Sequence, residues 1–347
     1  MTLKESEISL LIIYTGGTIG MVQDPQSGAL KPFNIENLYK HIPVLESYPF
    51  RIDSISFDPL VDSSGIDPDF IIELAGLIEK NYEYYDGFVV LHGSDTMAYT
   101  ASFLSFMLEN LNKPVILTGA QLPLGVLRSD GRENFINAIE IASAHDDGTP
   151  RVPEVAIYFE NKLYRGNRTH KANAEDFNAF RSENHPALAN IGVNIKYYQN
   201  YILKPNFKKI KVHKKLDSNI NIIKLFPGLG KNSLHSMLFA PGLKGVILET
   251  YGSGNAPDTD WFVDAIKKAT ERGVLIVNIT QCEAGAVIEG KYAASLPLYN
   301  AGVIPGYDMT TEASIAKMMY LIGRGFSLEE QKKLMKKSLR GELTEPS

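Results

Sequence analysis

Short apolar runs alternate along the chain with longer segments in which apolar residues recur every three or four positions. The short runs are typical of buried parallel strands, and the longer segments are typical of amphipathic helices. In the first half of the chain, the expected strands span residues 8–14, 87–91, 114–118 and 155–159. The expected helices span residues 68–82, 96–109 and 130–143, and residues 162–168 are expected to close an antiparallel hairpin. This order predicts an α/β fold, in which a mostly parallel sheet carries helices on its faces.

The alternation stops after Asn190 and starts again at Ile220. Residues 197–216 are polar and basic and contain Pro205, which is typical of an interdomain connector. The second alternating set spans residues 220–225, 243–249, 259–270, 274–279, 310–321 and 328–337. A chain of 347 residues exceeds the size of about 250–300 residues at which one core usually stops growing. We therefore expect a larger N-terminal α/β domain at 1–195, a linker at 196–218 and a smaller C-terminal α/β domain at 219–347.

The composition is that of an ordinary globular protein, with 44% hydrophobic and 22% charged residues. A net charge of -5 gives no support for binding to nucleic acid or to an anionic membrane, and the basic segment 208–215 is expected to be a solvated strand of the connector. The single cysteine, Cys282, excludes an internal disulfide and suits a reducing compartment. No signal peptide is recognisable, and no apolar run approaches the ~20 residues of a membrane span. We therefore expect a cytoplasmic protein.

Two threonine-bearing turns follow predicted strands, at residues 14–20 and 91–97. The carboxyl ends of strands in an open α/β sheet face the ligand crevice, so hydroxyls, glycines and the carboxylate of Asp95 would meet there. Such a set could form an acyl-transfer site for a small polar substrate. Helix capping is an alternative explanation for the polar residues of these turns. Thr15 or Thr18 could cap a helix after the first turn, and Ser94 or Asp95 could cap the helix at 96–109.

Two further segments carry candidate chemistry. Asp62, Ser63 and Ser64 form a polar turn that could hold a substrate carboxylate, although capping by Ser63 or Asp67 is an equally good explanation. Lys171 could act as a base if it is buried, whereas a lone lysine is usually a surface residue.

The sequence lacks the residue spacings that metal sites, nucleotide-binding loops and serine-hydrolase elbows require. The seven histidines include no His-x-x-x-His pair and have no partner cysteines, so we expect no metal site. The sequence Gly-Leu-Gly-Lys-Asn-Ser at 228–233 departs from a phosphate-binding loop at Asn232, and the glycine-rich turn at 252–257 ends in Pro257 rather than in a dinucleotide fingerprint. There is no Gly-x-Ser-x-Gly nucleophile elbow.

Seven motifs, in order, resemble the bacterial-type L-asparaginase family, and most closely its cytoplasmic type I branch. They are Thr-Gly-Gly-Thr-Ile-Gly at 15–20, Asp-Ser-Ser at 62–64, His-Gly-Ser-Asp-Thr-Met at 92–97, Leu-Thr-Gly-Ala-Gln at 117–121, Arg-Ser-Asp-Gly-Arg-Glu-Asn at 128–134, Tyr-Arg-Gly-Asn-Arg-Thr-His-Lys at 164–171 and Tyr-Gly-Ser-Gly-Asn-Ala-Pro at 251–257. The resemblance covers nearly the whole chain. It implies the two-domain asparaginase-like fold and hydrolysis of L-asparagine to L-aspartate and ammonia, without metal or organic cofactor.

The resemblance also implies roles for individual residues. Thr18 matches the nucleophile, and Ser94, Asp95 and Lys171 match a second triad that moves protons. The groups expected to hold the substrate, together with Asp95, are Asp62, Ser63, Ser64, Gly93, Ala120 and, from a neighbouring subunit, Asn255. The expected assembly is a homotetramer built from two tight dimers.

Three departures from the family pattern stand out. Ser94 replaces the usual threonine, which keeps the hydroxyl, and the loop near residues 28–30 lacks the tyrosine that several relatives carry. The third concerns an activating asparagine site that some type I enzymes have: Cys282 matches a position there, but Glu249 replaces an arginine and His170 replaces a threonine. A glutamate would repel the effector carboxylate, so we expect activation to be absent or the effector to bind differently.

Alternative functions on this fold are a broader glutaminase-asparaginase, the ammonia-releasing subunit of a tRNA-dependent amidotransferase, and a non-catalytic amino-acid sensor. One methylene separates L-glutamine from L-asparagine, worth about 1–3 kcal/mol in a pocket, so we expect weaker activity on glutamine. The amidotransferase subunit normally carries an extra amino-terminal domain, whereas few residues precede the first strand here. A sensor would be expected to have lost its catalytic groups, but Thr18, Asp95 and Lys171 are present.

Overall fold

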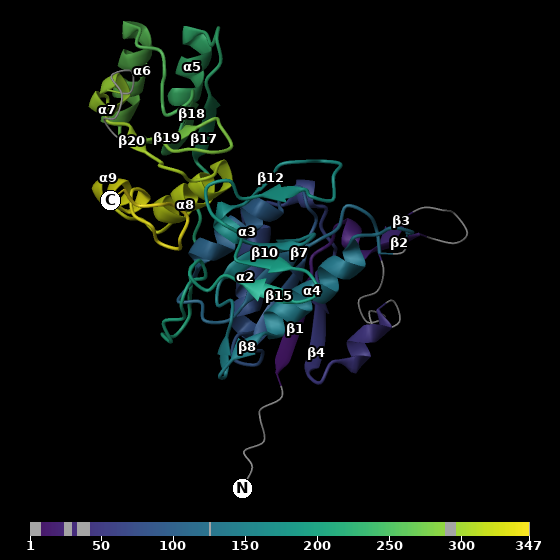
Figure 1. The fold of residues 1–347 in the computed structure, drawn as a ribbon. Coiled ribbons are helices and arrows are strands. Elements are labelled where there is room, and N and C mark those ends of the chain that lie inside the picture. Colours follow the sequence, from purple (N-terminus) through teal and green to yellow (C-terminus); the bar gives the residue numbers. More distant parts are fainter. Residues whose placement is uncertain (1–7, 24–29, 33–41, 125, 289–295, 347) are drawn as a thin grey trace. The chain divides into compact units, whose positions relative to one another are not determined.

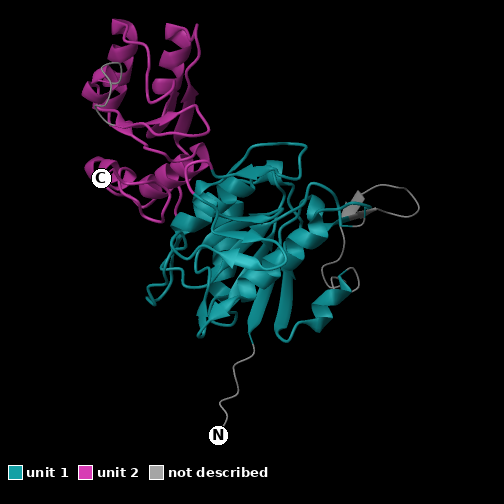
Figure 2. Ribbon diagram, in the orientation of Figure 1, with its two compact units in different colours: residues 1–182, 186–214 teal, residues 183–185, 215–347 magenta. Residues whose placement is uncertain are grey.

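The computed structural model describes residues 8–23, 30–32, 42–124, 126–288 and 296–346. The chain divides into two compact units: unit 1 contains residues 1–182 and 186–214, and unit 2 contains residues 183–185 and 215–347 (Figure 2). The expected linker, 196–218, thus contains the point between Lys214 and Lys215 at which the two units divide.

Unit 1 is built on an eight-stranded sheet with helices on its faces (Figure 1). The strand order is β15-β14-β11-β10-β7-β5-β1-β4, and the five strands from β10 to β4 are parallel. These strands are β1 (Ser9–Tyr14), β4 (Arg51–Ser56), β5 (Gly87–Leu91), β7 (Val115–Thr118), β10 (Val155–Phe159), β11 (Lys162–Arg165), β14 (Ala189–Ile191) and β15 (Ile195–Tyr197). The chain passes from β1 to β4 on one side and then to β5 on the other, so the strand order reverses at β1. Ligands of open α/β sheets bind at such a reversal, beside the carboxyl ends of the strands.

The core of unit 1 lies on both sides of β1. Leu10, Ile12 and Tyr14 belong to one cluster with Phe135 and other buried residues of α4 (Gly131–Ser143). Leu11 and Ile13 are fully buried too, and alternate side chains of a strand point to opposite faces. The remaining helices of eight or more residues described in unit 1 are α2 (Pro68–Asn81) and α3 (Met97–Met107). A strand buried on both faces explains why β1, β5 and β10 read as continuous apolar runs.

The observed elements confirm the α/β prediction and correct some details. The strands expected at 87–91 and 155–159 have these bounds, and β11 closes the expected antiparallel hairpin on β10. The helix expected to reach residue 109 ends at Met107, because Leu108–Glu109 form β6, which pairs with β16 (Lys211–Val212). The basic segment is therefore anchored to unit 1: His213 Nε2 lies 2.7 Å from Glu109 Oε2, and Lys214 Nζ lies 2.6 Å from Glu79 Oε2.

Unit 2 is a smaller α/β layer built on a four-stranded parallel sheet of order β17-β18-β19-β20. Its strands are β17 (Ile220–Lys224), β18 (Gly245–Thr250), β19 (Leu275–Thr280) and β20 (Ile304–Pro305). Its described helices are α5 (Lys231–Leu238), α6 (Asp260–Glu271), α7 (Leu296–Asn300), α8 (Thr311–Gly323) and α9 (Leu328–Met335). Leu248, Phe262 and Ile266 are among the residues of its core.

A buried ion pair fixes the end of the chain to α8. Lys317 and Glu342 are both fully buried, with 2.5 Å between Nζ and Oε1, and Nζ also donates to the carbonyls of Met335 and Lys337. Removing one partner of a buried pair leaves the other charge uncompensated, so Lys317→Met should lower the free energy of unfolding by about 3–5 kcal/mol. Urea denaturation measures this, and Lys332→Met, in the exposed pair with Glu329, is the control with an expected cost below about 1 kcal/mol. Equal losses in the two variants would contradict the prediction.

Candidate active site

The two threonine-bearing turns follow β1 and β5, the neighbouring strands at which the order reverses. Thr15 is buried, and both its N–H and its hydroxyl donate to the carbonyl of Leu91, at 3.0 and 2.9 Å. Thr15 therefore joins the ends of the two strands and does not cap a helix. Thr18 begins the short 3-10 helix η1 (Thr18–Gly20), whose N-cap is Gly17, and its side chain is half-buried.

Glycines bring three loops into close contact beside Thr18: the first two meet through their backbones, and the third meets Gly93 through the side chain of Ser63. Gly17 has φ 85°, and a Cβ atom built on it would lie 2.5 Å from the Cα of Gly93. A Cβ on Gly93 would lie 2.6 Å from the Oγ of Ser63. The turn after β1, the turn after β5 and the polar turn at Ser63 therefore form one contiguous wall that requires glycine at two positions.

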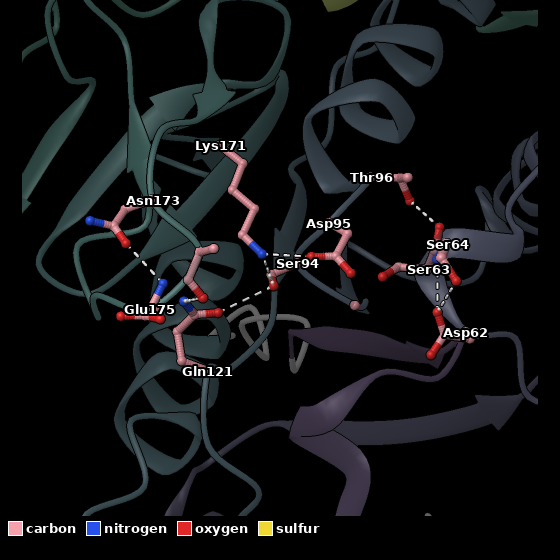
Figure 3. Close-up of polar contacts among 12 residues, drawn as sticks. Asp62, Ser63, Ser64, Ser94, Asp95, Thr96, Gln121, Lys171, Asn173 and Glu175 are labelled. Carbon is pink, nitrogen blue, oxygen red and sulfur yellow. Dashed lines mark hydrogen bonds and ion pairs between the residues drawn. The ribbon is translucent and has the colours of Figure 1, made fainter.

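Lys171 meets the second turn through its side chain (Figure 3). Its Nζ donates to Asp95 Oδ1 at 2.7 Å and to Ser94 Oγ at 2.9 Å. The side chain of Lys171 is 16% exposed and that of Asp95 is 62% exposed. Lys171 lies in β12 (His170–Lys171), which pairs with β13 (Phe180–Arg181). The strand pairing fixes its backbone, and the hydrogen bonds to Ser94 and Asp95 fix its side chain. The reading of Lys171 as an ordinary surface lysine is wrong.

The capping predictions around these turns are corrected by the structure. The N-cap of α3 is Thr96, whose hydroxyl donates to the carbonyl of Ser63 at 2.7 Å, while the side chains of Ser94 and Asp95 bind Lys171. At the start of α2, Asp67 accepts a hydrogen bond from the N–H of Phe70, so Asp67 and not Ser63 is the cap.

Asp62 orders the polar turn that precedes α2. Its Oδ1 accepts hydrogen bonds from the N–H of Ser64, at 2.8 Å, and from the Ser64 hydroxyl, at 2.6 Å (Figure 3). These hydrogen bonds lower the pKa of the Asp62 carboxyl, because they favour its charged form. Ser63 is buried, whereas Asp62 and Ser64 are exposed.

Gln121 is a member of the site that was not singled out from the sequence. Ser94 Oγ donates to its Oε1 at 3.3 Å, and its Nε2 donates to the carbonyls of Ala174 and Asp176 at 3.1 Å each. The side chain thus connects Ser94 to the loop that follows Lys171. Gln121 follows the buried Ala120 and lies in a motif quoted from the sequence, but its partners are 53 and 55 residues away and no local pattern indicates them.

The other predicted residues lie in unit 2, except His170, which precedes Lys171 in β12. Asn255 closes a turn on Tyr251 after β18, and its Oδ1 is buried without a hydrogen-bond partner among the described residues. Glu249 is 8% exposed, accepts a hydrogen bond from Thr311 Oγ1 at 2.7 Å and lies 3.5 Å from Lys224 Nζ. Cys282 is exposed.

The described ranges contain neither a group of three side chains suited to a metal ion nor a helix long and apolar enough to cross a membrane. Gly28 and Ala29, in the loop where several relatives carry a tyrosine, lie outside the described residues.

Two family models match the chain. The model of the asparaginase N-terminal domain matches residues 9–203, and that of the glutaminase/asparaginase C-terminal domain matches residues 219–335. The fold is that of an asparaginase-type two-domain α/β protein. The chain belongs to the asparaginase family, as the sequence motifs predicted.

Relatives agree with this assignment. The chain is 42% identical to L-asparaginase 1 of Escherichia coli K12, over 97% of this chain and 98% of that protein. It is 40% identical to the 60 kDa lysophospholipase of Mus musculus over 98% of this chain, but it spans only 63% of the length of that relative. The crystal structure of L-asparaginase I from Vibrio cholerae matches with a TM-score of 0.89 at 42% identity, covering 98% of this chain and all of that one. The type I resemblance is thereby confirmed.

Proposed function

We propose that the protein is an L-asparaginase, which hydrolyses the side-chain amide of L-asparagine to L-aspartate and ammonia. The observation that carries the proposal is the contact of Lys171 with Ser94 and Asp95 on the turn after β5. Gly93 in this turn is in backbone contact with Gly17, the residue before Thr18. A hydroxyl nucleophile and a proton-carrying group thus lie on loops that touch one another, as covalent catalysis requires.

The reaction proceeds in two steps in this proposal. The Thr18 oxygen attacks the amide carbon, the C–N bond breaks, and ammonia leaves with the proton that the hydroxyl has lost. Water then attacks the resulting β-aspartyl ester, which releases L-aspartate and restores the Thr18 hydroxyl. The hydrogen-bonded set of Lys171, Ser94 and Asp95 carries the protons in both steps.

The remaining groups hold the substrate. Asp95 engages Lys171 through Oδ1 and is largely exposed, so its carboxylate is open to an α-ammonium group. Ser63 and Ser64, with Asp62 ordering their turn, would bind the α-carboxylate. The amides at Gly93 and Ser94 and the carbonyl of Ala120 would surround the scissile amide.

The assembly is part of the same proposal. Asn255 would enter the site of a neighbouring subunit in a homotetramer of two tight dimers. Its Oδ1, which has no hydrogen-bond partner in the part of the chain that the structure describes, is an acceptor suited to such a contact. We propose the cytoplasm as the compartment, because the sole cysteine is a free thiol.

Ammonia release from L-asparagine and L-glutamine tests the function. We expect turnover of both, with kcat/KM for asparagine higher by about 10–200-fold, the value of one methylene in a pocket. Comparable values for the two amides would favour the broader glutaminase-asparaginase. Binding of asparagine without ammonia release would favour the sensor.

Ser94 is expected to be interchangeable with threonine. The variant Ser94→Thr adds one methyl group and keeps the oxygen that accepts from Lys171, so kcat should stay within about threefold of the wild-type value. Ser94→Val has the same shape as threonine but lacks the hydroxyl, and its kcat should fall by about 10²-fold. Steady-state ammonia assays on the two variants make the comparison, and equal rates would show that the hydroxyl at this position has no function.

Glu249 is expected to prevent activation by asparagine. Its carboxylate is almost buried between Thr311 and Lys224, so a second carboxylate arriving there would meet a like charge. The rate should therefore follow a hyperbola over a wide range of asparagine concentrations. Glu249→Gln should leave that shape unchanged, because glutamine removes the repulsion but does not supply the positive charge of the arginine that Glu249 replaces. A sigmoidal wild-type curve that becomes hyperbolic on substitution of Glu249 or Cys282 would contradict this prediction.

A further inference from the structure

His92 lies directly before the turn that carries Ser94 and Asp95, and its ring is completely buried. Its Nδ1 lies 2.7 Å from the carbonyl oxygen of Gly93, and its Nε2 lies 3.0 Å from the hydroxyl oxygen of Thr100 in α3. The ring of Phe70 packs edge-on against it, with 6.3 Å between the ring centroids. A histidine between two fixed partners in an apolar enclosure has one defined orientation.

The partners determine where the ring carries its proton. A carbonyl oxygen can only accept, so Nδ1 must be the protonated nitrogen, and in the neutral ring Nε2 then accepts from the Thr100 hydroxyl. Burial lowers the pKa of His92 to about 4, so the ring stays neutral throughout the physiological range. This rules out a change of charge during turnover near neutral pH and leaves a fixed hydrogen-bond donor.

The bond to the Gly93 carbonyl fixes one peptide plane. In a trans peptide the C=O and the following N–H point in opposite directions. Because the Gly93 carbonyl faces the buried ring, the N–H of Ser94 must point away from it. The N–H of His92 itself donates to the carbonyl of Thr118 at 2.9 Å, which fixes the Leu91–His92 peptide at the start of the same turn.

We propose that His92 is a positioning residue that sets the Gly93–Ser94 peptide so that the Ser94 N–H can donate to the oxyanion formed when Thr18 attacks the amide. The inference rests on the proposed asparaginase activity. Donors placed in advance at a developing oxyanion stabilise the transition state more than the ground state, so the contribution should lie in kcat rather than in KM.

Two substitutions separate the two contacts of the ring. The Nδ2 of asparagine can occupy the place of Nδ1, and the Nε2 or Oε1 of glutamine can occupy the place of Nε2. His92→Asn therefore keeps the donor to Gly93 and loses the contact with Thr100, whereas His92→Gln does the reverse. If the Gly93 contact carries the function, His92→Gln should lower kcat by about 10²-fold and His92→Asn by no more than about fivefold, with little change in KM. The opposite ranking would overturn the proposal.

Thr100→Val is the matched control for packing. It removes the partner of Nε2 but leaves His92 and its bond to Gly93, so the melting temperature should fall while kcat stays close to the wild-type value. The pH profile of kcat should have the same midpoints in the wild type and in His92→Asn. A shifted acid limb in that variant would mean that His92 exchanges protons with the substrate, which would also overturn the positioning role.

A spectroscopic measurement separates this proposal from the proposed function. Long-range ¹H–¹⁵N correlation spectra distinguish the Nδ1–H tautomer from the Nε2–H tautomer, and the His92 signal is identified by its absence in His92→Asn. The Nδ1–H form, unchanged from pH 6 to pH 8, is expected whether or not asparagine is the substrate. The Nε2–H form or a charged ring would refute the hydrogen-bond arrangement. If the tautomer is as expected but the wild type releases no ammonia, the proposed function fails instead.

Discussion

Thr18→Ala is expected to reduce the rate of ammonia release from L-asparagine by at least about 10⁴-fold, because removing the nucleophile of a covalent mechanism abolishes the two-step path. The alanine keeps the backbone of η1, and Gly17 retains its contact with Gly93, so the fold and the binding of asparagine should survive. Initial rates with the purified variant give the loss, and calorimetric titration with asparagine shows that the site is intact.

Thr18→Ser is the control for this prediction. Serine restores the hydroxyl without the methyl group, so a substantial part of the activity should return, and a burst of ammonia equal to the number of sites would be seen if hydrolysis of the ester is slow. Thr15→Ser is a second control and should keep the activity. The Thr15 hydroxyl donates to the Leu91 carbonyl, and a serine hydroxyl can make the same hydrogen bond. Full activity in Thr18→Ala would reject Thr18 as the nucleophile and direct attention to Ser94.

Lys171→Met is the substitution with the second-largest expected effect. It removes the cation that joins Asp95 and Ser94, so proton transfer to the leaving group and from water loses its carrier. General acid–base catalysis contributes about 10²–10⁴-fold, and kcat should fall by that factor. Single-turnover ammonia release measures the first step separately from hydrolysis of the ester.

Lys171→Arg distinguishes proton transfer from charge pairing. Arginine keeps the positive charge beside Asp95 but does not give up its proton in proteins, so it should rescue the melting temperature and not kcat. Lys162→Met, on the exposed end of β11, is the control for loss of a lysine and should be without effect. Rescue of kcat by arginine would show that Lys171 acts through its charge alone.

The elements that the sequence predicts best are those buried on both faces. β5 and β10 have their predicted bounds because every residue in them is apolar and buried, so the pattern ends where the strand ends. β4 was not predicted, because Ile52 is the one buried residue among its six at the edge of the sheet, and a strand such as β20 has only two residues. Edge and short strands are formed by pairing with neighbours, which a local pattern does not contain.

The site was predictable as a location but not as a set of contacts. The turns after β1 and β5 could be placed at the carboxyl edge of the sheet from the alternation alone. The capping predictions for Ser94 and Asp95 were wrong because Lys171, which is 77 and 76 residues away, offers these side chains a stronger partner than the helix N–H groups. The resemblance to a family pointed to Lys171. The contacts of Gln121 and of the His92 ring follow from the three-dimensional structure and could not be predicted from the sequence.

The contact between Gly17 and Gly93 limits how this enzyme can be re-engineered. At Gly17 and Gly93 the wall beside Thr18 is main chain, and any side chain at these two positions would push the loops apart. Random mutagenesis of that wall should therefore yield inactive variants rather than variants with a new substrate range. Variation that alters the choice between amides has to come from side chains at the rim, such as Ser64 and Gln121, so libraries aimed at selectivity should leave the glycines untouched.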